Sequence, residues 1–170
     1  MLIGQDNTLQ VYSEKEYSVL IRNIHMKIED VMISEGVYTD ILAIKHHKKY
    51  KVVTRLLLEN GKHVDIGQDT ILHVVEEHDR PRLIPAKNIQ HGHIICPPIP
   101  SYADIRTWAA TYGVGVKTRQ LILAKVSTII FDKCEYVPIN GVPILHDNHE
   151  DKNIRKLAKR SNSLARLILG

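Results

Sequence analysis

The sequence is poor in cysteine and in large aromatic residues, and it has no long apolar run. Its 170 residues contain two cysteines, one tryptophan and one phenylalanine. Two thiols, Cys96 and Cys134, are too few for the disulfide framework of a small secreted protein. No apolar stretch approaches the ~18 residues that span a bilayer, and the N-terminus lacks a basic segment followed by an apolar one. The sequence therefore predicts a cytoplasmic protein with reduced thiols and no membrane contact.

Signatures of the common enzyme classes are also missing. The stretch YGVGVKT (112–118) has a valine between its second glycine and its lysine, so it is not a phosphate-binding loop. No serine or cysteine stands in a nucleophile elbow. The sequence contains ten histidines, but their spacing has neither the paired cysteines nor the HExxH pattern of a zinc site. We therefore expect no cofactor and no bound metal.

The composition is that of a soluble globular protein with a basic excess. Hydrophobic residues make up 44% and charged residues 25% of the chain, with a formal net charge of +4. Because aromatics are few, branched aliphatic residues must fill the core, and isoleucine and valine favour strands. The positive charge permits an anionic partner without establishing one.

Short runs rich in isoleucine, valine and leucine, separated by polar turns, predict a compact mainly β fold. The expected strands lie within 8–13, 17–24, 30–34, 39–48, 50–61, 62–67, 71–77 and 83–98. Strand composition returns at 127–145, with Asn140–Gly141 as a hairpin turn.

Three prolines within the stretch CPPIPS (96–101) mark a boundary, because proline forbids regular strand pairing. The expected organisation is a β body at 1–98, a helical insert at 99–126, strands at 127–148 that return to the body, and a basic helix at 149–170. In the insert, Ser101 is the expected N-cap of the first helix and Gly113 its C-cap.

The order of several motifs resembles the Hint fold, which inteins and hedgehog autoprocessing domains share. In the stretch from 52 to 98, LENGKHVDI supplies a hairpin and GQDTILHVV occupies the place of a Thr-x-x-His motif. IPAKNIQHGHII is similar to the segment that follows in the family, with His93 in place of an aspartate. The opening MLIGQDNTLQV and the late INGVPILHDN are similar to the two ends of that fold. The resemblance implies a compact β domain of the Hint type.

The resemblance also implies a chemistry whose residues are altered here. In the family, a thiol or hydroxyl at the first position attacks the preceding carbonyl, and the thioether of Met1 has no ionisable proton. The spacing places the motif's threonine and histidine on Gly67 and Thr70, and His73 follows three residues later. We therefore expect no catalytic residue. The remaining candidates for residual self-cleavage are His146, Asn148 and His73.

Residues 105–126 resemble a helix-turn-helix. Trp108, Ala109 in a small-residue position and Gly113 fit two helices that cross at a tight turn, and glycine allows a positive φ there. The second helix, at 116–126, would present polar residues to DNA. A plain helical hairpin fits the same pattern, and Arg119 falls where the DNA-binding motif usually has an apolar residue.

Residues 149–169 read as an amphipathic helix with an apolar stripe and a basic face. The residues predicted to contact nucleic acid on the insert and on this helix are Lys117, Thr118, Arg119, Gln120, Lys156, Lys159 and Arg166.

Three functions follow as expectations. The first is a Hint-like binding module that does not splice and that contacts nucleic acid. The second is a structural protein of a larger assembly, in which the stripe of the C-terminal helix packs on a protein partner. The third is intein-like self-cleavage, the enzymatic activity that the sequence favours.

Overall fold

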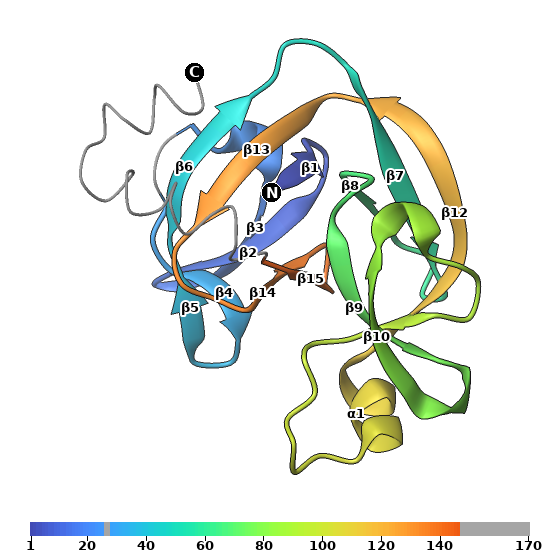
Figure 1. The fold of residues 1–170 in the computed structure, drawn as a ribbon. Coiled ribbons are helices and arrows are strands. Elements are labelled where there is room, and N and C mark those ends of the chain that lie inside the picture. Colours follow the sequence, from blue (N-terminus) through green and yellow to red (C-terminus); the bar gives the residue numbers. More distant parts are fainter. Residues whose placement is uncertain (26–27, 147–170) are drawn as a thin grey trace.

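The computed structural model describes residues 1–25 and 28–146, and within them the chain is mainly β, as predicted. The largest sheet has nine strands. Its order is β10 (Arg80–Pro85), β9 (Ile71–Glu76), β11 (Ile94–Ile95), β12 (Val114–Ala124), β7 (Lys51–Leu58), β8 (His63–Ile66), β1 (Leu2–Gly4), β13 (Val126–Phe131) and β6 (Ile41–His46). Every pairing in it is antiparallel. The sheet curves around the start of the chain, so β1 lies near the centre of the fold (Figure 1).

Two smaller sheets complete the body. One has the order β3 (Lys15–Leu20), β2 (Thr8–Ser13), β4 (Val31–Ser34) and β5 (Val37–Thr39); the other is the hairpin of β14 (Tyr136–Ile139) and β15 (Val142–Leu145). Single 3-10 turns are η1 (Ile21–Asn23), η2 (Glu77–Asp79) and η3 (Ala86–Asn88). The described residues contain one α-helix, α1 (Ile105–Tyr112), and that helix is too short to cross a bilayer.

Hairpin turns fix the register at the places where the sequence predicts them. Asn140 and Gly141 have φ angles of 52° and 77°, which is the backbone that a two-residue turn of type I′ requires. Ile139 therefore pairs with Val142. Gly61, at φ 82°, closes the loop between β7 and β8.

One large apolar cluster joins all three sheets. It is built of isoleucine, leucine and valine, with Ala86 and with Phe131 as its one aromatic member. A second, small cluster of Val75, Cys96 and Ala109 docks α1 on the body, and the indole N–H of Trp108 donates to the carbonyl of Pro97 at 3.0 Å. Trp108 therefore anchors the helix to the proline-rich segment.

The predicted helix-turn-helix is wrong. Its first helix is α1, but residues 116–124 of the expected second helix belong to the long strand β12, which pairs with β7 from Val116 to Ala124. Tertiary pairing overrides helical propensity here, because a full strand partner is available and because glycine and β-branched residues at 113–116 weaken a helix. Gly113 has φ −87° rather than a positive value, and it is needed because a Cβ there would clash with Ala109 and Ile94.

The helix also begins later than predicted. Asp104, not Ser101, is the N-cap of α1, and its carboxylate accepts the backbone N–H of Thr107 at 3.0 Å. This hydrogen bond, together with one from the Thr107 hydroxyl, lowers the pKa of Asp104. The predicted helix at 149–170 lies outside the described residues.

Candidate functional site

Of the two motif positions that the resemblance places on Gly67 and Thr70, Gly67 lies against the first strand and Thr70 lies against Gly67. The backbone N–H of Gly67 donates to the carbonyl of Leu2 at 2.9 Å. A Cβ on Gly67 would lie 3.3 Å from the Cβ of Leu2 and 3.3 Å from the hydroxyl oxygen of Thr70. A side chain at position 67 would therefore reach the peptide groups at the start of β1, and glycine places no functional group there.

Met1 is held on β13 by two backbone hydrogen bonds. Its amino group donates to the carbonyl of Ile129 at 2.9 Å, and the N–H of Ile129 donates to the carbonyl of Met1 at 2.9 Å. The thioether packs against the large apolar cluster. The side chain at this position contributes packing and has no proton to give up.

His73 is paired with a buried thiol. Its Nδ1 lies 3.5 Å from Sγ of Cys96, and the Cys96 N–H donates to the His73 carbonyl at 3.0 Å. Burial raises the pKa of Cys96 to about 11, and burial also lowers the pKa of His73. Both groups are neutral at pH 7, so this pair holds no thiolate and acts as a packed strand contact. Thr70 and His73 have Thr-x-x-His spacing, but only Thr70 adjoins Gly67.

A second histidine and thiol lie at the end of the described chain. Nδ1 of the buried His146 is 3.6 Å from Sγ of Cys134, and its ring packs edge-on against Phe131 with centroids 5.8 Å apart. Phe131 follows Ile129, the partner of Met1, by two residues on β13. His146 is thus placed at the edge of the same central region, while Asn148 lies outside the described residues.

Side-chain amides of the buried Asn7 and the half-buried Asn140 tie this centre together, and the sequence did not predict them. Asn7 donates to the carbonyl of Asp65 at 2.6 Å and accepts the Asp65 N–H at 3.2 Å. Asn140 donates to Asn7 at 3.0 Å and to the carbonyl of His63 at 2.8 Å, and it accepts the N–H of Thr8 at 2.6 Å. The network joins β2, β8 and the β14–β15 turn. Its polar atoms are used for structure and are not available to a substrate.

An ion pair continues the network on β7. Nε and Nη2 of Arg55 donate to the two carboxylate oxygens of Asp65 at 2.8 and 3.0 Å. Asp65 is buried, and its hydrogen bond raises the pKa of Arg55. The sequence held a signal for this pair, because the two residues are symmetric about the Asn60–Gly61 turn and so face each other in the hairpin register.

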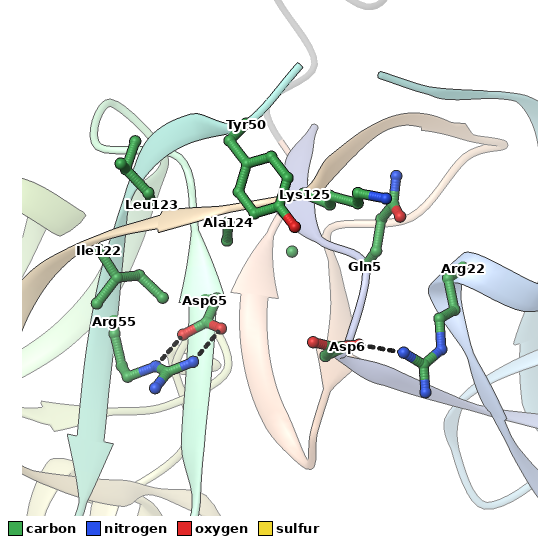
Figure 2. Close-up of a pocket in the computed structure, with 11 residues that line it drawn as sticks. Gln5, Asp6, Arg22, Tyr50, Arg55, Asp65, Ile122, Leu123, Ala124 and Lys125 are labelled. Atoms are coloured by element: carbon green, nitrogen blue, oxygen red, sulfur yellow. Dashed lines mark hydrogen bonds and ion pairs between the residues drawn. The ribbon is translucent and has the colours of Figure 1, made fainter. Parts of the chain in front are cut away.

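A pocket of about 390 Å³ opens beside this ion pair (Figure 2). Its charged lining residues are Asp6, Arg22, Arg55, Asp65 and Lys125. Both carboxylates are engaged, because Arg22 pairs with Asp6 at 2.9 Å as Arg55 does with Asp65. Figure 2 shows Tyr50 over the opening with its hydroxyl directed inward. The pocket has a net positive lining.

The residues predicted to contact nucleic acid are brought together only in part. Lys117, Thr118, Arg119 and Gln120 are all exposed, and they lie on β12 instead of a recognition helix. Lys117 has no partner on β7, because the register of β12 with β7 shifts between Val116 and Thr118. After this irregularity successive side chains point to opposite faces, so Arg119 does not share a face with Thr118 and Gln120. Lys156, Lys159 and Arg166 lie outside the described residues. Within residues 1–25 and 28–146, no three His, Cys, Asp or Glu side chains form a group that could hold a metal.

Comparisons with known proteins identify the fold. No protein-family model matches the sequence, and no curated protein matches it. Among solved structures, the chain is similar to the Msm DnaB1 intein splicing domain bound with zinc, at a TM-score of 0.62 and 13% identity over 85% of this chain and 99% of that one.

Two further intein structures give the same result. A DnaB intein from Synechocystis matches at a TM-score of 0.61 and 10% identity over 86% of this chain and 98% of its own. The gp41-1 intein matches at 0.56 and 12% identity over 86% and 99%. Since each splicing domain is covered almost completely, the resemblance seen in the motifs is confirmed: the chain has the Hint-like fold of intein splicing domains.

Proposed function

We propose that this chain is a binding module built on the Hint fold, in which the chemistry of peptide-bond rearrangement is lost. The observation that supports the proposal is the contact between Gly67 and Leu2. The position that adjoins the first peptide groups has no side chain, and Met1 offers a thioether where the family's reaction needs a thiol or hydroxyl.

The other groups at the centre have structural roles. The Cys96 thiol is neutral at pH 7 because burial raises its pKa to about 11. Asn7, Asp65 and Asn140 bond to one another and to the backbone. A rigid β fold without a reactive nucleophile can still bind a partner through its exposed surfaces, which is the function proposed here.

The test places the chain between two unrelated soluble domains and follows the intact mass of the fusion for days at neutral pH, with and without added thiol. We expect one uncleaved and unrearranged species. The control carries Met1→Cys, Gly67→Thr and Thr70→His together, and thiol-dependent cleavage of this variant would locate the loss at these positions. Cleavage or ligation by the unaltered chain, including release at Asn148, contradicts the proposal.

The predicted contact with nucleic acid stays a prediction. Its support is the set of exposed cations on β12, since two-stranded ribbons also enter nucleic-acid grooves. The variant Lys117→Glu plus Arg119→Glu tests it: affinity for duplex DNA and its dependence on salt should both fall. Unchanged affinity would exclude this site.

A further inference from the structure

The outer part of β12 has an open edge. Its first residues pair with β11, through Ile94 with Gly115 and Ile95 with Val114, and hydrogen bonds from the 91–93 segment extend to Val116 and Lys117. From Thr118 to Ala124, β12 pairs with β7 on one side, and no strand of residues 1–25 and 28–146 pairs with its other side. Figure 1 shows this part of β12 on the outer rim of the molecule. An open edge presents N–H and C=O groups to another strand.

The face beside this edge is apolar and exposed. Val52 faces Leu123 and Thr54 faces Leu121 in the register of β7 with β12, so these side chains share one face. Leu121 is 64% exposed, Leu123 68%, Val52 46% and Tyr50 60%. These four residues are called the ribbon surface below. A cluster of exposed large apolar residues of this kind marks a contact site.

Cations stand at both ends of the ribbon surface. Arg119 precedes Leu121 by two residues and Lys125 follows Leu123 by two, so an alternating strand carries all four on one face. The Lys125 ammonium lies 5.8 Å from the centre of the Tyr50 ring. No Asp or Glu side chain of the described residues forms an ion pair with Arg119 or Lys125.

The surroundings of Lys125 are positive as well. The pocket beside Arg55 is lined by Lys125, Tyr50 and Leu123. The two carboxylates of this pocket, Asp6 and Asp65, already pair with arginines. His47 is close to this end in sequence, and its pKa is lowered first by burial and then by the charges of Lys51 and Lys45. This end of the ribbon surface therefore favours an anionic group.

Charge argues against two occupants that the chain itself could supply. If a second copy paired antiparallel around Leu121, Arg119 of one strand would lie diagonally opposite Lys125 of the other, within reach of a long side chain, and like charges that meet across a pair destabilise it. The chain beyond the described residues, 147–170, carries six Lys or Arg against three Asp or Glu. That segment is cationic like the surface, so electrostatics oppose its docking there.

We propose that residues 118–124 of β12 bind an extended acidic peptide as an added strand. Main-chain hydrogen bonds form along the open edge, two apolar side chains of the peptide pack on Leu121 and Leu123, and acidic side chains at its two ends pair with Arg119 and Lys125. The two cations are six residues apart, or ~20 Å along a strand. The order cation, leucine, leucine, cation along this face is the same in both directions. The matching peptide therefore has an acidic, an apolar, an apolar and an acidic residue at alternate positions, whichever way it runs. This inference rests on the proposed function and names the class of partner.

The experiment measures binding of the peptide Glu-Thr-Val-Thr-Val-Thr-Glu, labelled with a fluorophore, to the full chain by anisotropy at several salt concentrations. We expect saturable binding that weakens as salt rises. A peptide of the same composition with the order scrambled, and one with lysine in place of both glutamates, should bind at least tenfold more weakly. Equal binding of the scrambled peptide would overturn the added-strand geometry.

Variants separate this surface from the rest of the sheet. Leu121→Thr plus Leu123→Thr should weaken binding at least tenfold, and Arg119→Glu should weaken it and reduce its dependence on salt. Leu83→Thr is the matched control, because Leu83 is also 64% exposed and lies on β10, the strand at one end of the nine-stranded order. An equal effect of Leu83→Thr would overturn the assignment.

Further outcomes test the competing occupants. Amide hydrogen exchange of 118–124 should be fast in the free protein and slow with the peptide. Protection without peptide would mean that a second copy or the chain's own tail covers the edge, and would overturn the proposal. Duplex or single-stranded DNA that binds more tightly than the peptide, and loses affinity in Lys117→Glu plus Arg119→Glu, would assign the surface to nucleic acid instead. None of these results depends on whether the chain cleaves itself, so the two proposals fail separately.

Discussion

The two ends of β7 differ in burial and in the partners of their side chains. Near its hairpin with β8, Arg55 binds the buried Asp65, and Asp65 is joined to Asn7 and Asn140, so the charged and amide groups of this cluster have partners. At the start of β7, Tyr50 and Val52 are exposed beside Leu121 and Leu123, and the edge of β12 is open. Polar residues in the centre hold the frame, whereas the unsatisfied groups that could bind a partner lie on the rim. The proposed binding surface therefore lies away from the first strand, where the chemistry of intein-like domains is expected.

The largest effect is expected at the ion pair of the centre. Asp65→Ala leaves the Arg55 guanidinium without its partner and should lower the free energy of unfolding by about 2–3 kcal/mol, below the usual range for a fully buried pair because Arg55 is 32% exposed. Urea unfolding measures it. Asp6→Ala is the matched control: the Asp6–Arg22 pair is exposed, and its loss should cost less than about 1 kcal/mol. Equal losses would mean that the centre is no more tightly coupled than the surface.

An intermediate effect should appear at alkaline pH through Cys96. Burial raises its pKa from 9.0 to about 11, so above pH 9 the unfolded chain releases a proton that the folded chain retains. Stability contributed by the neutral thiol is complete below pH 9 and is lost as pH rises toward 11. Relative to Cys96→Ala, the wild-type protein should lose about 1 kcal/mol of unfolding free energy per pH unit in this interval. Parallel stability curves for the two proteins would show that Cys96 ionises freely.

The smallest effect is expected at the rim. Leu121→Thr plus Leu123→Thr exchanges exposed leucines for a residue that also favours strands, so the free energy of unfolding should change by less than about 0.5 kcal/mol per site. Thermal and urea unfolding of the variant and of the wild type measure this. A loss of several kcal/mol would mean that these side chains are packed in solution, and the contrast between centre and rim would fail.

Local patterns predicted the parts of the fold that depend on near neighbours in sequence. The β2 segment 8–13, the Asn140–Gly141 turn and the first helix of the insert followed from residue type and spacing. The second helix failed because 116–126 satisfies a helical pattern locally, and only the distant strand β7 makes the extended form better. The predicted N-cap was Ser101, and the observed one is Asp104. Both residue types can cap a helix, so the sequence alone does not decide between them.

The candidate site divides in the same way. Sequence spacing assigned the altered motif to Gly67 and Thr70; Gly67 contacts Leu2 of the first strand, and Thr70 contacts Gly67, while their role stays a prediction. Folding brings together two thiol–histidine pairs, Cys96 with His73 and Cys134 with His146, whose members are 23 and 12 positions apart. No local sequence pattern predicted these pairs. Asn7 and Asn140 are more than 130 positions apart in sequence, so only the arrangement of the sheets shows that they form a hydrogen bond.

The sequence by itself determined that this is a mainly β domain with turns at Gly61 and Asn140–Gly141, because alternation, β-branched residues and positive-φ turn residues act over a few positions. Only the tertiary structure decided which strand lies at a free edge and which polar residues are engaged. Both depend on what packs on the other side of a strand, and that is a property of contacts between distant segments. The leucines at 121 and 123 of β12 fit a helix face or a core strand by composition, and only the tertiary structure shows that they are exposed beside an edge with which no described strand pairs.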